Sequence, residues 1–247
     1  MTNIEIRDLD ISINKGELIG IIGQNGCGKT NLLKKMIGRE NNTDIYIDNK
    51  CISEYDIIYK RNNIVCVFND NIFQTNKPKF ELQYYISLLK DREDYDRAIK
   101  DFIQYFNLDS ILDIEFDELS IENRVYVKIL SLLIINPTII CIDDLLSYLK
   151  IEKKSKIINY IKEKDIILFN VTSDMEELML FDKILILNKG KKELFDDTMK
   201  VLEQEKIFNE LGLKLPFIFD INNMLESYEL IDKKHLVSKE LVDILWK

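Results

Sequence analysis

Apolar positions recur along this chain with two different periods, and each period predicts a different element. Alternation of apolar and polar residues predicts half-exposed strands at 4–6, 11–13 and 44–48. Nearly unbroken apolar runs predict buried strands at 17–22, 62–68, 138–144, 166–169 and 183–188. The run at 183–188, closed by the turn at 189–191, is expected to be the final strand.

Apolar residues at three- and four-residue steps predict helices between these strands. They lie at 31–37, at 80–106 with a break at 91–94, at 122–135 and at 150–163. From about residue 197 onward the pattern is helical, with a break at 211–216. Alternating strands and helices indicate a largely parallel sheet covered by helices. The sequence therefore predicts the α/β class.

A phosphate-binding motif, G-x-x-x-x-G-K-[ST], joins the strand at 17–22 to the helix at 31–37. It consists of Gly23, Gln24, Asn25, Gly26, Cys27, Gly28, Lys29 and Thr30. Its glycines free the backbone, so that amide groups and the helix N-terminus can converge on phosphate oxygens. Lys29 can reach the β- and γ-phosphates, and the Thr30 hydroxyl can ligate Mg²⁺. Cys27 is interpreted as a small spacer residue.

Two carboxylates, Asp143 and Asp144, end the apolar run at 138–144. A strand that simply ends in a polar turn has the same pattern. Beside a phosphate-binding loop, however, the pattern predicts that Asp143 holds the Mg²⁺ shell and that Asp144 lies near the attacking water.

Composition narrows the class of partner. The chain has 247 residues and a net charge of −9, which argues against a nucleic-acid partner held through its phosphates. Four cysteines far apart in sequence suggest reduced thiols in a cytosolic protein. Because the longest apolar runs are too short to span a bilayer, any association with a membrane must come through a partner.

The order of these motifs resembles the nucleotide-binding domain of an ABC transporter. Leu119 and Ser120 open the helix at 122–135, Pro137 follows it, and the chain then enters the strand that ends at Asp143. The resemblance implies a P-loop NTPase fold of ABC type, with a mostly parallel sheet, an antiparallel β edge and a helical insertion at about 75–135. The expected domains are 1–196 and a small helical C-terminal extension, 197–247.

The extension itself is similar to that of energy-coupling factor (ECF) transporter ATPase subunits, through 208–216 and 237–245. This resemblance implies ATP and Mg²⁺ as ligands and hydrolysis of ATP coupled to uptake of a vitamin or metal ion. It also implies a second ABC ATPase subunit, an integral membrane subunit and a place on the cytoplasmic face of the membrane. The substrate is chosen by a different subunit, so this sequence does not specify it.

Several positions depart from the family pattern. The signature Leu-Ser-Gly-Gly-Gln is replaced by residues 119–123, in which Ser120 keeps the hydroxyl but Ile121 and Glu122 replace the glycines. The motif is expected to face the partner's site, where Glu122 places negative charge beside a phosphate unless a cation intervenes. The chain's only histidine, His235, is expected on the surface of the extension.

Other departures fall on the chain's own site. Asp144 stands where the family has Glu, Ser173 replaces the switch histidine, and Asn69 replaces a loop glutamine, with Gln74 nearby at another spacing. We therefore expect slow hydrolysis and a role as one half of a heterodimer. Two alternatives stay open: an ATPase subunit of another ABC system, and a nucleotide-sensing or scaffolding module outside transport. An apolar groove beside the helical insertion favours transport.

Overall fold

The computed structural model describes residues 3–38, 43–70, 72–89 and 95–228. The expectations for 237–245 and His235 lie outside these ranges. The helices are α1 (Lys29–Met36), α2 (Ile57–Asn63), α3 (Pro78–Ser87), α4 (Tyr95–Phe106), α5 (Ile121–Leu133), α6 (Ile151–Glu163), α7 (Thr198–Leu202), α8 (Glu205–Glu210) and α9 (Phe217–Ser227). The strands are β1 (Asn3–Ile6), β2 (Ile11–Asn14), β3 (Leu18–Ile22), β4 (Ile45–Ile47), β5 (Lys50–Cys51), β6 (Ile64–Val67), β7 (Ile139–Asp143), β8 (Ile167–Val171), β9 (Lys183–Asn188) and β10 (Lys191–Asp197).

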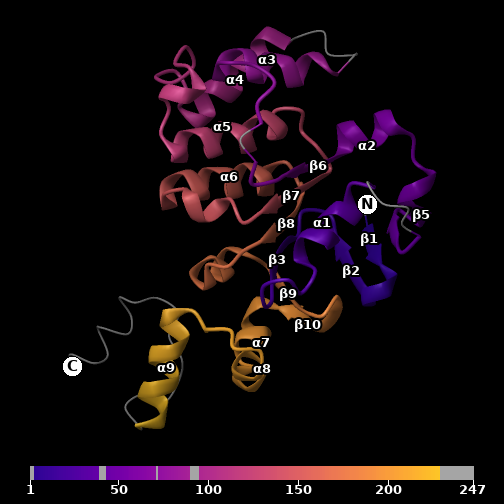
Figure 1. Ribbon diagram of the computed structural model, residues 1–247, viewed down its shortest axis with the longest axis vertical. Helices are drawn as coiled ribbons and strands as arrows, with labels where there is room; N and C mark the ends of the chain where they lie inside the picture. Colours follow the sequence, from indigo (N-terminus) through magenta and orange to yellow (C-terminus); the bar gives the residue numbers. More distant parts are fainter. Residues whose placement is uncertain (1–2, 39–42, 71, 90–94, 229–247) are drawn as a thin grey trace.

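The strands form two sheets (Figure 1). The main sheet has the order β10-β9-β3-β8-β7-β6, with parallel pairing from β9 to β6 and an antiparallel edge strand, β10. The smaller sheet, β2-β1-β4-β5, is antiparallel. The predicted α/β class, with a parallel core and an antiparallel edge, is confirmed.

Both faces of the parallel part of the main sheet are buried, which explains the unbroken apolar runs in its strands. In β3, Leu18 and Ile22 face a cluster formed with α3, α5, α6 and α8, whereas Ile19 and Ile21 face α1 and the small sheet. This central strand therefore holds the loop that follows it between two packed layers.

Two elements differ from the sequence expectations. The strand at 183–188 is not the last, because β10 follows it after a turn and pairs with it. β10 is a half-exposed edge strand rich in charged residues, so its apolar signal is weak. In addition, α2 occupies 57–63, and the strand expected from 62 begins at Ile64. None of the residues of α2 is buried, so no apolar periodicity marks it.

The described part of the C-terminal extension packs onto the main core. Figure 1 shows α7 and α8 beside the β9 and β10 end of the sheet, with α9 farther out. Phe208, Leu211, Leu215 and Phe219 belong to the same buried cluster as the helices that cover the sheet. The Thr198 hydroxyl donates to the Phe181 carbonyl at 2.7 Å, which fixes the start of α7.

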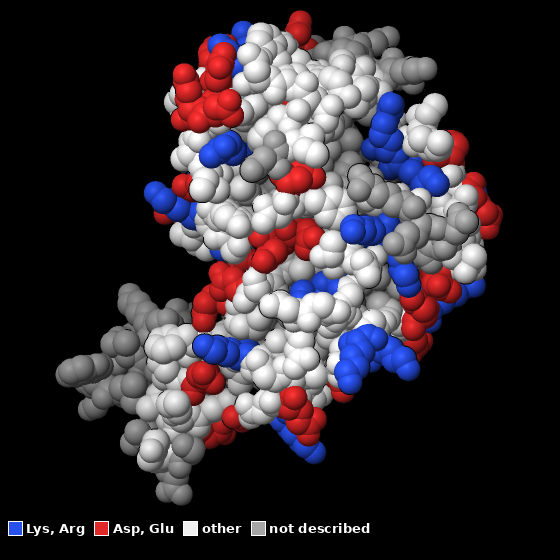
Figure 2. Space-filling view, in the orientation of Figure 1, with Lys and Arg blue, Asp and Glu red and all other residues white. Residues whose placement is uncertain are grey.

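The distribution of surface charge and the length of the helices bear on the class of partner. On the face shown in Figure 2, Lys and Arg side chains are scattered among Asp and Glu. Within the described ranges, no helix is both long enough and apolar enough to cross a membrane.

Candidate functional site

The phosphate-binding loop runs from the end of β3 to the start of α1, as the motif predicts. Gly23 has φ +149°, and a Cβ atom there would lie 2.2 Å from the Leu187 carbonyl oxygen. Gly28, at φ +108°, is the N-cap of α1 and accepts a hydrogen bond from the Leu32 amide at 2.9 Å. These two positions therefore require glycine, one for space and both for backbone conformation.

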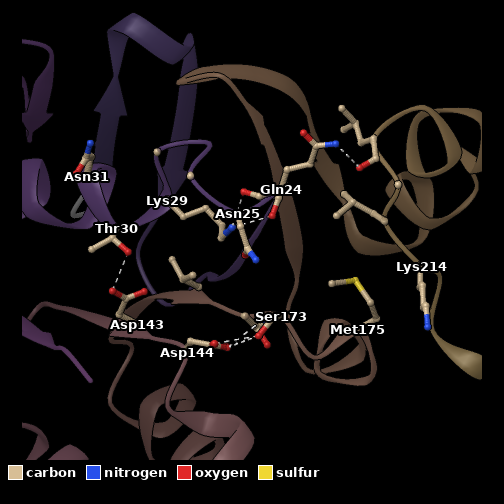
Figure 3. A pocket seen from close by; sticks show the side chains of 18 residues that line it. Gln24, Asn25, Lys29, Thr30, Asn31, Asp143, Asp144, Ser173, Met175 and Lys214 are labelled. Carbon is tan, nitrogen blue, oxygen red and sulfur yellow. Dashed lines mark hydrogen bonds between the residues drawn. The ribbon is translucent and has the colours of Figure 1, made fainter. Parts of the chain in front are cut away.

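Lys29 folds back across the loop that precedes it. Its ammonium donates to the Gly23 carbonyl at 2.7 Å and to the Gln24 carbonyl at 3.0 Å (Figure 3). The positive charge is thus held over the loop whose amides are expected to receive phosphate. Cys27 is buried, and its amide donates to the Gln24 carbonyl at 3.2 Å.

Thr30 and Asp143 meet although they are far apart in the sequence. The Thr30 hydroxyl, on the first turn of α1, donates to Asp143 Oδ2 at 2.9 Å. Burial raises the pKa of Asp143, although the hydrogen bond from Thr30 opposes this shift. A hydroxyl and a carboxylate are hard oxygen donors, which Mg²⁺ prefers, so the two side chains fit this ion. A bound cation would also favour the charged form of Asp143.

Asp144 and Ser173 form a second contact at the same sheet edge, because β7 and β8 are adjacent parallel strands. Asp144 has φ +55°, and its amide donates to the Val171 carbonyl at 2.9 Å. The Ser173 hydroxyl lies 2.9 Å from both oxygens of the Asp144 carboxylate, and the Ser173 amide donates to Oδ1 at 3.1 Å. The residue that replaces the expected histidine therefore holds the second carboxylate directly.

These groups surround one cavity of about 680 Å³, which is within the usual size range of ligand pockets. Figure 3 shows Lys29, Asn25 and Gln24 on one side and Asp143, Asp144 and Ser173 on another. The lining residues are Gly23, Gln24, Asn25, Gly26, Gly28, Lys29, Thr30, Asn31, Asp143, Asp144, Val171, Thr172, Ser173, Met175, Leu211, Gly212, Leu213 and Lys214.

The last four of these residues, 211–214, are a contribution that sequence reasoning missed. The sequence indicates a break between helices here and a resemblance to the ECF extension, but no pattern links the segment to a loop so distant in the chain. The Leu-Gly-Leu sequence, which supports the ECF resemblance, is the one signal in the sequence that could have drawn attention to this segment.

Asn69 and the signature residues do not line this cavity. Asn69 and Ile121 instead line a separate cavity of about 250 Å³ beside the helical insertion. There the Asn69 amide nitrogen lies 3.5 Å from the Tyr148 hydroxyl. Ser120 is the N-cap of α5 and accepts from the Asn123 amide at 3.2 Å. Gln74 is the other candidate for the loop position, and its backbone amide donates a hydrogen bond to Glu81 Oε2 at 3.0 Å.

Glu122 turns toward α6. Its carboxylate lies 3.3 Å from Lys153 Nζ and accepts from the Lys150 amide at 3.2 Å. Burial raises the pKa of Glu122, but the Lys150 amide and the Lys153 ammonium outweigh it, so the pKa lies below its usual value. A cation therefore accompanies this carboxylate within the single chain.

Comparison with known proteins identifies the family. The ABC transporter family model matches residues 6–147, more than half of the chain. The energy-coupling factor transporter ATP-binding protein EcfA1 of Staphylococcus aureus (strain MSSA476) is 27% identical over 229 residues, which cover 89% of this chain and 85% of that protein.

Solved structures agree on the fold. CbiO1 from Clostridium perfringens, described as part of the ABC transporter complex cbiONQ, matches with a TM-score of 0.71 and 21% identity, covering 88% of this chain and 97% of that one. A dimeric ATP-binding cassette with ADP and Pi matches with a TM-score of 0.66 and 20% identity, covering 80% and 99%. The matched family model, the fold and the phosphate-binding loop together show that this chain belongs to the ABC transporter family, as an ATP-binding subunit similar to those of ECF transporters.

Proposed function

We propose that this chain is the ATP-binding subunit of an ECF-type importer, which couples ATP binding and slow hydrolysis to uptake of a vitamin or metal ion. One observation carries the proposal. The phosphate-binding loop, the Thr30–Asp143 pair and Asp144 line a single cavity, in a chain whose likeness to EcfA1 extends over 89% of its length.

Each residue of the cavity receives a role in this proposal. Lys29 and the amides of 23–30 bind the phosphates, and Lys29 exchanges its two carbonyl partners for phosphate oxygens. Thr30 and Asp143 hold Mg²⁺, which when bound neutralises charge on the phosphates. Asp144 is the candidate for orienting the attacking water.

The proposed hydrolysis is slow because the Asp144 carboxylate is hydrogen-bonded to Ser173 and is therefore not free to orient water. Both of its oxygens lie 2.9 Å from the Ser173 hydroxyl, and its side chain is one methylene shorter than that of Glu. A displacement of ~1 Å in a catalytic group can cost ~10²-fold in rate. Asn69 lies in the other cavity, so in this subunit it does not assist.

A second ATPase subunit is proposed to complete the assembly. The signature residues Ser120, Ile121 and Glu122 would face the partner's nucleotide. Ile121 is 60% exposed where the family places a glycine. This chain would therefore present a branched side chain to that site, where a glycine would leave the backbone accessible. In a homodimer, each nucleotide site would combine the departures of this chain's own site with those of its signature motif. In a heterodimer, no site would contain both.

The cavity beside the helical insertion is the proposed docking site for a helix of the membrane subunit, on the cytoplasmic face of the membrane. Phe73, Val125, Leu145 and Tyr148 supply its apolar lining for this contact, whereas Ile121, which also lines the cavity, is assigned to the partner's nucleotide. Arg124 and Asp70 also line it, so it can bind an amphipathic helix. The apolar lining favours a transport role over a sensing or scaffolding module.

The test is affinity purification of the full chain from detergent-solubilised membranes. The proposal predicts recovery of a second ABC ATPase and a polytopic membrane protein. Val125→Glu, in the docking cavity, should lose the membrane protein and keep the ATPase. Ile58→Glu, on the exposed helix α2, makes the same type of change outside the cavity and should keep both. Recovery of soluble proteins alone would favour the sensing or scaffolding function.

Nucleotide binding is tested separately, with the isolated chain and Mg²⁺-ATP. Lys29→Ala should abolish most of the binding, and Lys35→Ala is the control. Lys35 lies on the same helix but pairs with Asp8 at 3.0 Å. Equal affinities of the two variants would refute the assignment of the phosphate site, and turnover at ordinary ABC ATPase rates would refute slow hydrolysis.

A further inference from the structure

The segment 211–214 of the C-terminal extension forms one wall of the nucleotide cavity. It connects α8 to α9 and lines the same cavity as Lys29 and Ser173. Leu211 is buried, whereas Gly212 and Lys214 are exposed. The roles given above to the phosphate-binding loop and the two carboxylates leave this wall without a function.

One contact fixes the start of the segment to the phosphate-binding loop, and a second fixes the start of α9, beyond the segment, to a residue next to Met175 of the cavity. The Gln24 side-chain amide donates to the Leu211 carbonyl at 2.9 Å, and Figure 3 shows this side chain turned away from Lys29. At the start of α9, the Phe217 amide donates to Glu176 Oε1 at 2.6 Å. Glu176 belongs to the short helix η5 (Met175–Leu180), which follows Ser173 closely.

Gln24 contacts both the lysine and the extension. Its backbone carbonyl accepts from Lys29 at 3.0 Å, and its side chain holds Leu211. When a phosphate binds Lys29, the lysine leaves the carbonyl of the residue whose side chain anchors the extension. The phosphate loop and the extension thus share one residue, and coupling through it would be reciprocal.

We propose that residues 211–214 are a wall of the nucleotide site and that Gln24 is a positioning residue, which couples occupancy of the phosphate loop to this segment. The inference rests on the proposed function, because it requires that the loop bind nucleotide. It adds that the C-terminal extension contributes, within the same chain, to the site at which ATP binds.

The test is amide hydrogen exchange on the full chain, with and without Mg²⁺ and a non-hydrolysable ATP analogue. The amides of 211–213 donate within the segment 207–213 and so give a baseline; for example, Leu213 donates to the Phe208 carbonyl at 2.8 Å. Nucleotide should slow exchange both in 23–30 and in 211–213. Slowing in 23–30 alone would overturn this inference and leave the proposed function intact. No slowing in 23–30 would refute both.

Two isosteric variants separate the loss of the Gln24–Leu211 hydrogen bond from the addition of a negative charge to the loop. Gln24→Glu replaces the amide donor by an oxygen that faces the Leu211 carbonyl. Without nucleotide, it should speed exchange at 211–213 by about fivefold, the effect of one lost hydrogen bond. Asn25→Asp makes the same change of charge one residue away and should leave that exchange unaltered. Equal exchange at 211–213 in the two variants would overturn the role of Gln24.

Discussion

A buried ion pair between α6 and the short helix η5 supports a quantitative prediction. Lys154 on α6 donates to Glu177 Oε1 at 2.6 Å, and the two residues are 9% and 2% exposed. Asp174 is a second acidic neighbour of Lys154, at 3.8 Å. Asn170 reaches Glu177 only at 3.5 Å. The lysine therefore has an alternative partner, and the glutamate has only a weak one.

This asymmetry sets the order of the expected effects. Removing one member of a buried ion pair costs about 3–5 kcal/mol of the free energy of unfolding. Glu177→Gln leaves Lys154 near Asp174, so we expect the lower end, about 3 kcal/mol. Lys154→Met leaves the Glu177 carboxylate without a cation, so we expect the upper end, about 5 kcal/mol. The double variant should cost only about 1–3 kcal/mol, the cost of the buried amide at position 177, because no uncompensated charge stays buried.

Urea unfolding at pH 7, followed by far-ultraviolet circular dichroism, measures all four proteins in one series. The free energies of unfolding of the parent chain, the two single variants and the double variant give the coupling energy directly. Destabilisation of the double variant by the sum of the two single effects would refute the reasoning. So would a larger cost for Glu177→Gln than for Lys154→Met.

Three further predictions concern other parts of the molecule. Gly23→Ala should abolish nucleotide binding measured by calorimetry, because its Cβ would lie 2.2 Å from the Leu187 carbonyl oxygen; binding at parental affinity would contradict the loop geometry. Ser173→His should raise the ATPase rate if the missing histidine limits turnover, and no gain would mean that another departure dominates. Burial raises the pKa of Glu17, but the Lys183 ammonium at 2.8 Å and the hydrogen bonds from Asn14 together outweigh it and lower the pKa below its usual 4.5, so the ionised carboxylate stabilises the fold above that pH. Glu17→Gln should therefore cost about 0.5–1 kcal/mol at pH 7. The difference should vanish in acid unfolding curves as the pH falls below 4.5 through the folded-state pKa.

The sequence was sufficient to predict what local pattern and motif spacing determine. The loop at 23–30, the helix opened by Ser120 and the strand ending at Asp143 each combine a local signal with an established chemical requirement. The strand β10 could not be predicted, because a charged edge strand has little apolar periodicity.

Contacts between distant segments were also beyond sequence reasoning. The hydrogen bond between Ser173 and Asp144 depends on the register of β7 and β8, and that between Gln24 and Leu211 depends on where α8 packs. The cation beside Glu122 belongs to the same group, because Lys153 approaches it from another helix. Pattern identifies such residues as candidates, whereas only packing decides which of them meet.

The shared core of the sheet and the extension has a consequence for how the chain unfolds. Phe208, Leu211, Leu215 and Phe219 are buried with the helices of the nucleotide-binding part, so separating them would expose their apolar surface to water. The described part of the extension and the sheet are therefore expected to melt in a single cooperative transition. A protease that cuts near residue 204 should release no folded fragment, because the two pieces would stay associated until the whole core opens.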